Sequence, residues 1–163
     1  MKNNRLLIAP VFIPHEGCPY RCVFCNQTDI TGYKKQADKE NVLSVLKTYL
    51  SPNSNIKHFS RREVAFYGGS FTGLSDERQD FLLSLIQPLI RNGKVDAIRV
   101  STHPLFINER QLKRLKKNGV QTVELEIQST NHPSLRYLVD CEIGLDLMIE
   151  IIDSQSEIPK NYF

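Results

Sequence analysis

The sequence has no long apolar run and few cysteines, and each shortage excludes a class of protein. No apolar run reaches the roughly 18 residues of a membrane span. The N-terminal stretch 1–14, MKNNRLLIAPVFIP, lacks a small-residue cleavage site and contains two prolines, so we expect a strand there rather than a signal peptide. Four cysteines without a secretory context do not suggest a disulfide framework. We therefore expect a cytoplasmic chain that does not associate with a membrane.

Length and charge narrow the choice further. The 163 residues suit one domain with a sizeable core. The net charge is only +3, and Lys and Arg are spread through the chain, so charge alone does not indicate nucleic-acid binding. A closed (β/α)8 barrel usually takes about 250 residues, and this chain is too short for one.

Short apolar runs alternate with helical patterns along most of the chain. We expect helices at 38–50, 75–93 and 108–119, and strands at 6–13, 63–69, 96–102 and 121–129. Asp38, Ser75 and Asn108 are the expected N-caps, and Pro88 should kink or restart the second helix. Such alternation predicts an α/β fold with a parallel sheet, either open or part of a (β/α) barrel. In both, ligands bind at the carboxyl ends of the strands.

Three cysteines lie close together in the segment 17–27, GCPYRCVFCNQ. Cys18, Cys22 and Cys25 have the spacing C-x3-C-x2-C. Thiolates are soft ligands that suit zinc or iron–sulfur clusters. A structural zinc site takes four ligands, usually as two separated pairs, and His15 could complete such a set. A cubane cluster held by three cysteines keeps one iron open for a ligand. A small zinc-binding module therefore stays an alternative to an iron–sulfur site.

Polar residues recur where the expected strands end. Gly68-Gly69-Ser70 follows the second strand, and Ser101-Thr102-His103 ends the third. Strand alternation separates an apolar face, expected to pack on helices, from a polar face. The polar face of the last two strands carries Arg99, Ser101, His103, Glu124, Glu126 and Gln128. We expect this face to line the barrel interior, where ribose or carboxylate groups could be held by Ser101, His103, Glu126 and Gln128.

Four segments together resemble the radical S-adenosylmethionine (radical SAM) family, in the branch related to the catalytic subunit of Elongator. They are FIPHEGCPYRCVFCNQ (12–27), FYGGSFTGL (66–74), IRVSTHP (98–104) and VELEIQS (123–129). The resemblance covers roughly residues 7–140. It implies a partial (β/α) barrel with a [4Fe–4S] cluster on Cys18, Cys22 and Cys25. It also implies that Phe24 packs beside the cluster and the adenine, and that the carbonyls of Gly68 and Gly69 meet the methionyl amino group of S-adenosylmethionine.

The resemblance implies reductive cleavage of S-adenosylmethionine to a 5′-deoxyadenosyl radical, with a one-electron donor as partner and a tRNA base as the leading candidate substrate. Two positions depart from the family pattern. His103-Pro104-Leu105 stands where an arginine, a proline and an acid are usual, and Glu126 stands where a small residue is usual.

The expected organisation is a C-terminally truncated radical SAM core at 1–140, with about four βα units and the last units missing. A divergent helical and polar tail would follow at 141–163. The tail or a partner would then cover the open barrel edge at the fourth strand. The alternative is a catalytically inactive remnant that only binds an iron–sulfur cluster.

Overall fold

The computed structural model describes residues 5–19, 25, 37–51 and 58–125. The chain divides into two compact units, 1–19 with 26–126 and 20–25 with 127–163. All helices and strands described below belong to the first unit. The predicted boundary between 1–140 and 141–163 lies outside the described residues and stays a prediction.

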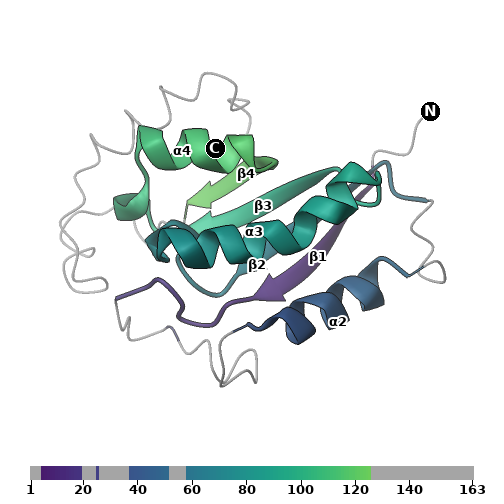
Figure 1. The fold of residues 1–163 in the computed structure, drawn as a ribbon, viewed down its shortest axis with the longest axis horizontal. Helices are drawn as coiled ribbons and strands as arrows, with labels where there is room; N and C mark the ends of the chain where they lie inside the picture. The colour runs from purple at the N-terminus through teal and green to yellow at the C-terminus, as the bar shows by residue number, and fades with distance from the viewer. Residues whose placement is uncertain (1–4, 20–24, 26–36, 52–57, 126–163) are drawn as a thin grey trace. The chain divides into compact units, whose positions relative to one another are not determined.

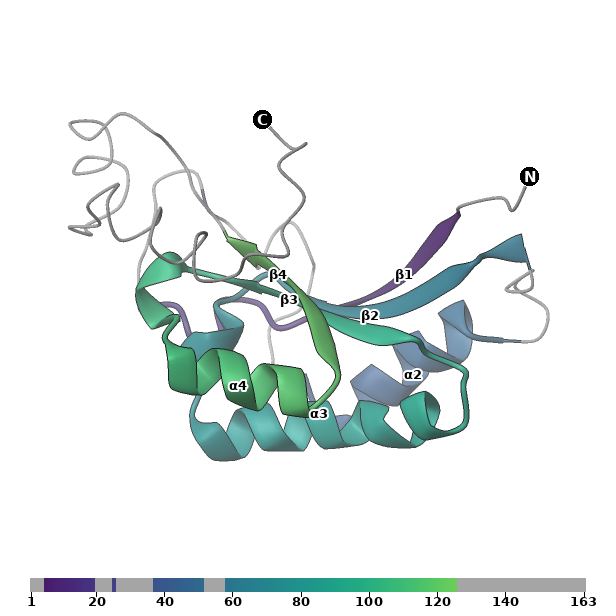
Figure 2. The same ribbon diagram turned by 90° about the horizontal axis from the view of Figure 1, so that it is seen from above.

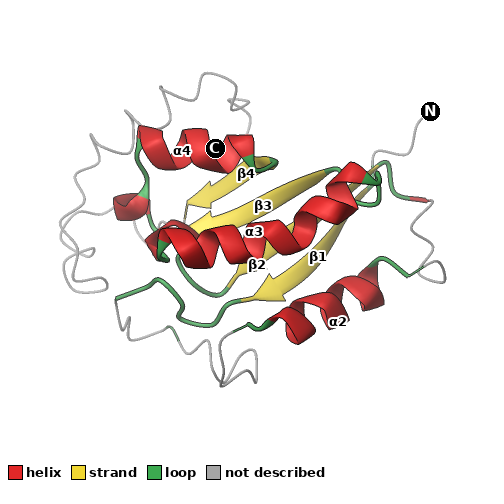
Figure 3. Cartoon of the chain, in the orientation of Figure 1, coloured by secondary structure: helices red, strands yellow, loops and turns green. Residues whose placement is uncertain are grey.

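The first unit is built on a four-stranded parallel sheet in the order β1-β2-β3-β4 (Figure 1). Its strands are β1 (Leu6–Phe12), β2 (Arg61–Tyr67), β3 (Ala97–Thr102) and β4 (Val120–Leu125). The helices between them are α2 (Lys39–Tyr49), α3 (Asp76–Arg91) and α4 (Glu109–Lys117), so strand and helix alternate (Figure 3). This order confirms the predicted α/β fold with four parallel strands, which is the wall of a partial barrel.

Each helix begins at a predicted N-cap. The side chain of Asp38 accepts a hydrogen bond from Asn41 N at 2.8 Å. Ser75 accepts one from Arg78 N at 3.2 Å, and Asn108 accepts one from Gln111 N at 2.9 Å. Each cap satisfies a first-turn N–H that has no partner within its helix. None of the described helices is long and apolar enough to cross a membrane.

The predicted alternatives at Pro88 were a kink or a restart of the second helix, and the helix does not restart, because α3 continues through Pro88 to Arg91. The kink stays a prediction. A proline removes one backbone hydrogen bond from the ladder. Here the loss is outweighed on both sides of Pro88. The buried Leu83 and Ile86 hold the preceding turn in the core, and Asn92 N donates to the carbonyl of Pro88 itself at 3.2 Å.

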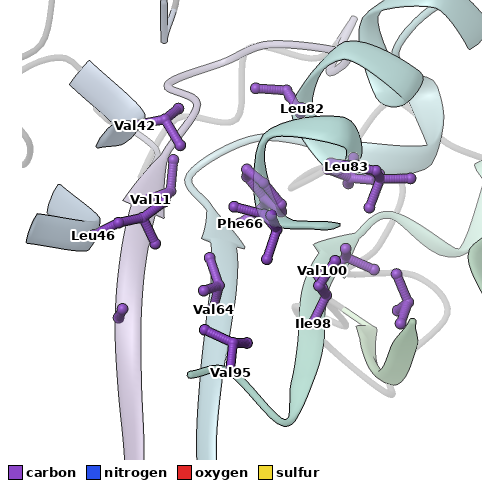
Figure 4. Close-up of a cluster of buried hydrophobic side chains, with 14 of the residues drawn as sticks. Val11, Val42, Leu46, Val64, Phe66, Leu82, Leu83, Val95, Ile98 and Val100 are labelled. Carbon is purple, nitrogen blue, oxygen red and sulfur yellow. The ribbon is translucent and has the colours of Figure 1, made fainter. Parts of the chain in front are cut away.

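The helices cover one face of the sheet, and the apolar core lies between them and the strands (Figure 2). In Figure 4, Val42 and Leu46 of α2 lie near Val11 of β1. Leu83 of α3 belongs to the same cluster, together with Val64, Phe66, Ile98 and Val100 of the two central strands. Burial of such apolar area is the main term that stabilises the sheet. The predicted packing of the apolar strand face on the helices is therefore confirmed.

A bulge changes the alternation of β4. Ile98 pairs with Val120, but the next residue, Arg99, pairs with Thr122, so the register skips Gln121. One extra residue reverses which face every later side chain occupies. Val120 and Val123 consequently both pack against the core although they are three positions apart.

Candidate functional site

The loops after β1 and β2 are joined by backbone hydrogen bonds at the carboxyl edge of the sheet. Ile13 N donates to Tyr67 O at 2.8 Å, and His15 N donates to Gly68 O at 2.8 Å. Ser70 N donates in the opposite direction, to Glu16 O at 2.9 Å. These three backbone hydrogen bonds thus join the chain before Cys18 to the end of β2 and to the loop that carries Gly68 and Gly69.

Glycines make this close approach sterically feasible. Gly17 has a φ of +73°, and a Cβ there would lie 2.2 Å from Ser70 O. A Cβ on Gly69 would lie 2.4 Å from Glu16 O, and one on Gly73 would lie 2.1 Å from Gly17 O. Any side chain at these positions would separate the loops. We call the close approach of Glu16 and Gly17 to Gly69, Ser70 and Gly73 the glycine interlock.

Ser70 extends the interlock to the end of β3. Its hydroxyl lies 3.0 Å from Thr102 Oγ1 and accepts a hydrogen bond from His103 N at 3.1 Å. Thr72 Oγ1 lies 2.6 Å from the same Thr102 oxygen. Ser70, Thr72 and Thr102 are all buried. Three loops that the sequence placed at the ends of different strands therefore form one bonded assembly.

The structure describes two of the three cysteines. Cys18 is partly buried directly after the interlock, and its backbone N donates to His15 O at 3.3 Å. Cys25 is also partly buried and belongs to the second unit. Cys22 lies outside the described residues, as do the predicted cofactor-binding residues Phe24, Glu126 and Gln128. Among described side chains, no group of three or more His, Cys, Asp or Glu could hold a metal ion.

Gly68 and Gly69 lie at the carboxyl end of β2, directly after Tyr67. The carbonyl of Gly68 accepts from His15 N, as described above, and a carbonyl oxygen has a second lone pair for another donor. Gly68 also has a φ of +85°, which favours glycine. The contact with a methionyl amino group stays a prediction.

Ser101 and His103 lie at the end of β3. Ser101 is 4% exposed. His103 is half-buried, its Nδ1 accepts a hydrogen bond from Leu105 N at 3.3 Å, and its ring centroid lies 5.9 Å from that of Phe106. Burial lowers the pKa of His103 below 6.5, so the imidazole is neutral at pH 7. At this position the chain thus lacks the positive charge that the usual arginine would supply.

The sheet face opposite the helices carries a network of ion pairs. Glu63 of β2 is 2% exposed and accepts from Arg61 and from Arg99, whose Nε lies 2.8 Å from Glu63 Oε2. Arg99 also pairs with Glu124 of β4. Burial, with a further contribution from the Glu124 carboxylate, raises the pKa of Tyr67 above 10.0. The predicted polar face is confirmed for Arg99 and Glu124, and its two positive and two negative charges balance.

The sequence analysis missed Glu16 and Arg78. The Glu16 carboxylate is buried and receives two hydrogen bonds from the Arg78 guanidinium, at 2.9 and 3.0 Å. One signal was available. Arg78 occupies the first turn of α3, where the helix dipole disfavours a positive charge. An arginine there indicates a tertiary acidic partner.

Residues 12–142 match the Radical SAM superfamily, and this range covers most of the chain. The chain belongs to the radical SAM superfamily. Radical SAM proteins use a [4Fe–4S] cluster and S-adenosylmethionine, which they cleave. The family assignment favours iron–sulfur over the zinc alternative. No curated protein matches the chain.

The donor chemistry of this radical SAM chain fits the two cofactors. Three thiolates satisfy three of the four irons of a cubane and keep one accessible. The glycine interlock brings the bare backbone of Gly68 and Gly69 beside the chain that leads to Cys18.

Proposed function

We propose that the chain is a radical SAM enzyme that modifies a nucleoside, with a base in tRNA as the substrate. One observation carries the catalytic part of the proposal. Ser70 joins the loop before Cys18, the Gly68–Ser70 loop and His103 in one hydrogen-bonded assembly. The four segments that resemble the branch of the Elongator catalytic subunit support the choice of tRNA.

In this proposal Cys18, Cys22 and Cys25 hold the cluster, and Phe24 packs beside it. When bound to these cysteines and reduced, the cluster would supply the single electron needed for reductive cleavage of S-adenosylmethionine to methionine and a 5′-deoxyadenosyl radical. The carbonyls of Gly68 and Gly69 orient the methionyl amino group.

The remaining cofactor contacts come from the polar side of the strand ends. Ser101, His103, Glu126 and Gln128 bind ribose or carboxylate groups. Because His103 is neutral, it contributes a hydrogen bond rather than an ion pair to a carboxylate.

The charge balance of the polar sheet face also favours an uncharged group as the substrate. Glu63 and Arg99 already neutralise each other on that face, and Glu124 pairs with Arg99 as well. A phosphate there would have to displace one of these carboxylates, whereas a neutral base can hydrogen-bond to the network as it stands.

The test is anaerobic reconstitution of the full chain, with iron and sulfide quantified. Dithionite and S-adenosylmethionine are then added, and 5′-deoxyadenosine is followed by chromatography. We expect cluster formation and 5′-deoxyadenosine in the parent, and loss of both in Cys22→Ala. Cys141→Ala is the matched control, because this cysteine lies outside the three-cysteine motif, and we expect it to behave like the parent.

Two results would contradict the cofactor assignment. One is Cys22→Ala that keeps the parent's iron content and broad visible absorbance. The other is zinc without iron or sulfide after anaerobic purification, which would support the zinc module. The substrate is tested by adding unmodified tRNA and digesting it to nucleosides. A new nucleoside mass supports tRNA, and an active enzyme that leaves tRNA unchanged argues against it.

A further inference from the structure

We propose that Glu16, Arg78 and Ala37 form a clamp that closes the base of the cysteine segment and thereby retains the cluster. We call these three residues the Glu16 clamp. This inference rests on the proposed ligation of the cluster by Cys18, Cys22 and Cys25. It assigns Glu16 and Arg78 as positioning residues, which act through the cysteines.

The clamp joins two points that flank all three cysteines in the sequence. Ala37 N donates to Glu16 Oε1 at 3.0 Å across a separation of 21 positions. Glu16 precedes the first cysteine by two residues, and Ala37 follows the last by twelve. One buried carboxylate therefore joins positions 16 and 37, and all three cysteines lie between these positions in the sequence.

Arg78 completes the clamp from a third element, helix α3. Its Nε donates to Glu16 Oε2 at 2.9 Å, and its Nη2 donates both to Glu16 Oε1 at 3.0 Å and to the carbonyl of Ala37 at 2.7 Å. The planar guanidinium binds the carboxylate in a two-bond fork. Lysine carries the same charge but cannot reproduce this fork.

The ion pair of the Glu16 clamp is largely shielded from water. The Glu16 side chain is 5% exposed and that of Arg78 is 21% exposed. A buried carboxylate that loses its partner is strongly destabilised, so the closed arrangement is favoured over an open one.

Holding two separated points of a chain together removes conformational freedom that cluster binding would otherwise have to remove. The glycine interlock fixes Gly17 from the other side of Glu16, next to Cys18. Both devices act on the cysteine segment without offering a ligand. Their expected effect is on the rate at which the cluster is lost.

The chain offers a matched control in the Arg62–Asp96 pair. The two Arg62 nitrogens donate to the two Asp96 oxygens at 3.0 Å each, and the Arg62 side chain is 25% exposed. The fork and the exposure of the arginine resemble those of Arg78. The Arg62–Asp96 pair joins β2 to the start of β3, however, and does not bracket the cysteine segment.

The experiment compares the full-length parent with Arg78→Met and Arg62→Met, all reconstituted anaerobically. An iron chelator is added, and the decay of the cluster absorbance gives the rate of iron release. The apo forms are melted to give the Tm of each chain. We expect Arg78→Met to release iron about tenfold faster than the parent, in the range found for residues that support metal ligands. Arg62→Met should release iron at the parent's rate.

Arg78→Lys separates charge from geometry. If charge alone mattered, lysine would restore the slow release. We expect release from Arg78→Lys to stay faster than from the parent. Should Arg78→Met fail to fold, Glu16→Gln is the second variant, because it keeps an oxygen for Ala37 N while it weakens the arginine fork. The same direction of change is expected.

The outcomes distinguish the clamp from the proposed function. A parent that binds no iron–sulfur cluster overturns both. A parent that binds a cluster and forms 5′-deoxyadenosine, with Arg78→Met releasing iron at the parent's rate, overturns the clamp alone. Equal acceleration in Arg62→Met and Arg78→Met would mean that general stability sets the rate, and it too would overturn the clamp.

Discussion

The two ends of the sheet are held together in different ways. At the carboxyl end, Gly17 is crowded by backbone atoms of the next loop, and the buried Glu16 carboxylate pairs with Arg78. At the amino end, no atom beyond its chain neighbours lies within 4 Å of a Cβ built on Gly93, and the Asp96 carboxylate that pairs with Arg62 is more exposed to water than Glu16. In these two comparisons, the crowding of the glycine and the burial of the ion pair are greater at the end whose loops carry the proposed chemistry.

The largest expected effect tests this difference with two glycines of similar backbone conformation. Gly17 and Gly93 have φ values of +73° and +69°. An alanine at either position incurs the left-handed strain of about 1–2 kcal/mol. At Gly17 the added Cβ also meets Ser70 O, so Gly17→Ala should lower the free energy of unfolding by at least about 3 kcal/mol.

Urea unfolding of the apo chain measures both variants against the parent. The ratio of the two losses in unfolding free energy decides whether crowding of the backbone distinguishes the two ends of the sheet. Equal losses in Gly17→Ala and Gly93→Ala would show that the interlock relaxes easily and that the contrast between the ends is only one of backbone conformation.

A smaller effect is expected from His103 at the carboxyl end. Its folded-state pKa is below the ordinary 6.5, so the unfolded chain takes up this proton first as the pH falls. The contribution of neutral His103 to stability is complete above pH 6.5 and is lost below it. In thermal melts between pH 8 and 5, the parent should lose about 1–3 °C more than His103→Gln. Parallel curves for the two chains would contradict the buried neutral state.

The smallest effect is expected from Asp96 at the amino end, and it should occur in a different pH window. Hydrogen bonding from the Arg62 side chain lowers the pKa of Asp96 below its ordinary 3.8. The stabilisation is therefore complete above that pH and is lost as the pH falls through the lower folded-state pKa.

Melts of Asp96→Asn against the parent test this window. The variant should melt about 1–2 °C lower at pH 7, as is usual for an exposed pair, and the gap should close in acid. A gap that stays constant down to the lowest pH at which both chains still fold would mean that Asp96 acts through hydrogen-bond geometry and not through its charge.

Local signals in the sequence predicted the fold well. Asp38, Ser75 and Asn108 act within three residues of themselves, and all three cap their helices as expected. Pro88 does not restart the helix, because its local preference is opposed by the burial of Ile86 in the core, which no local pattern reports. The strand alternation correctly separated Val100 from Arg99.

Interactions between distant residues could not be predicted in the same way. Arg78 and Glu16 are 62 positions apart, and no spacing rule connects them. The Glu63–Arg99 pair joins residues 36 positions apart, although each lies at a polar position of its strand. Knowing that β2 and β3 are neighbours would have suggested this second pair, because opposite charges on one face of adjacent strands attract.

The bulge at Gln121 has a consequence for how the chain tolerates changes in length. Removing a residue from an ordinary strand moves every later side chain to the opposite face of the sheet, so that core residues become exposed and polar residues become buried. In β4, Gln121 is an extra residue without a partner on β3, because Val120 pairs with Ile98 and Thr122 pairs with Arg99. Loss of Gln121 would therefore leave Val123 and Glu124 on their present sides at the cost of its contact with Arg61. A deletion in this strand is therefore best accommodated at Gln121.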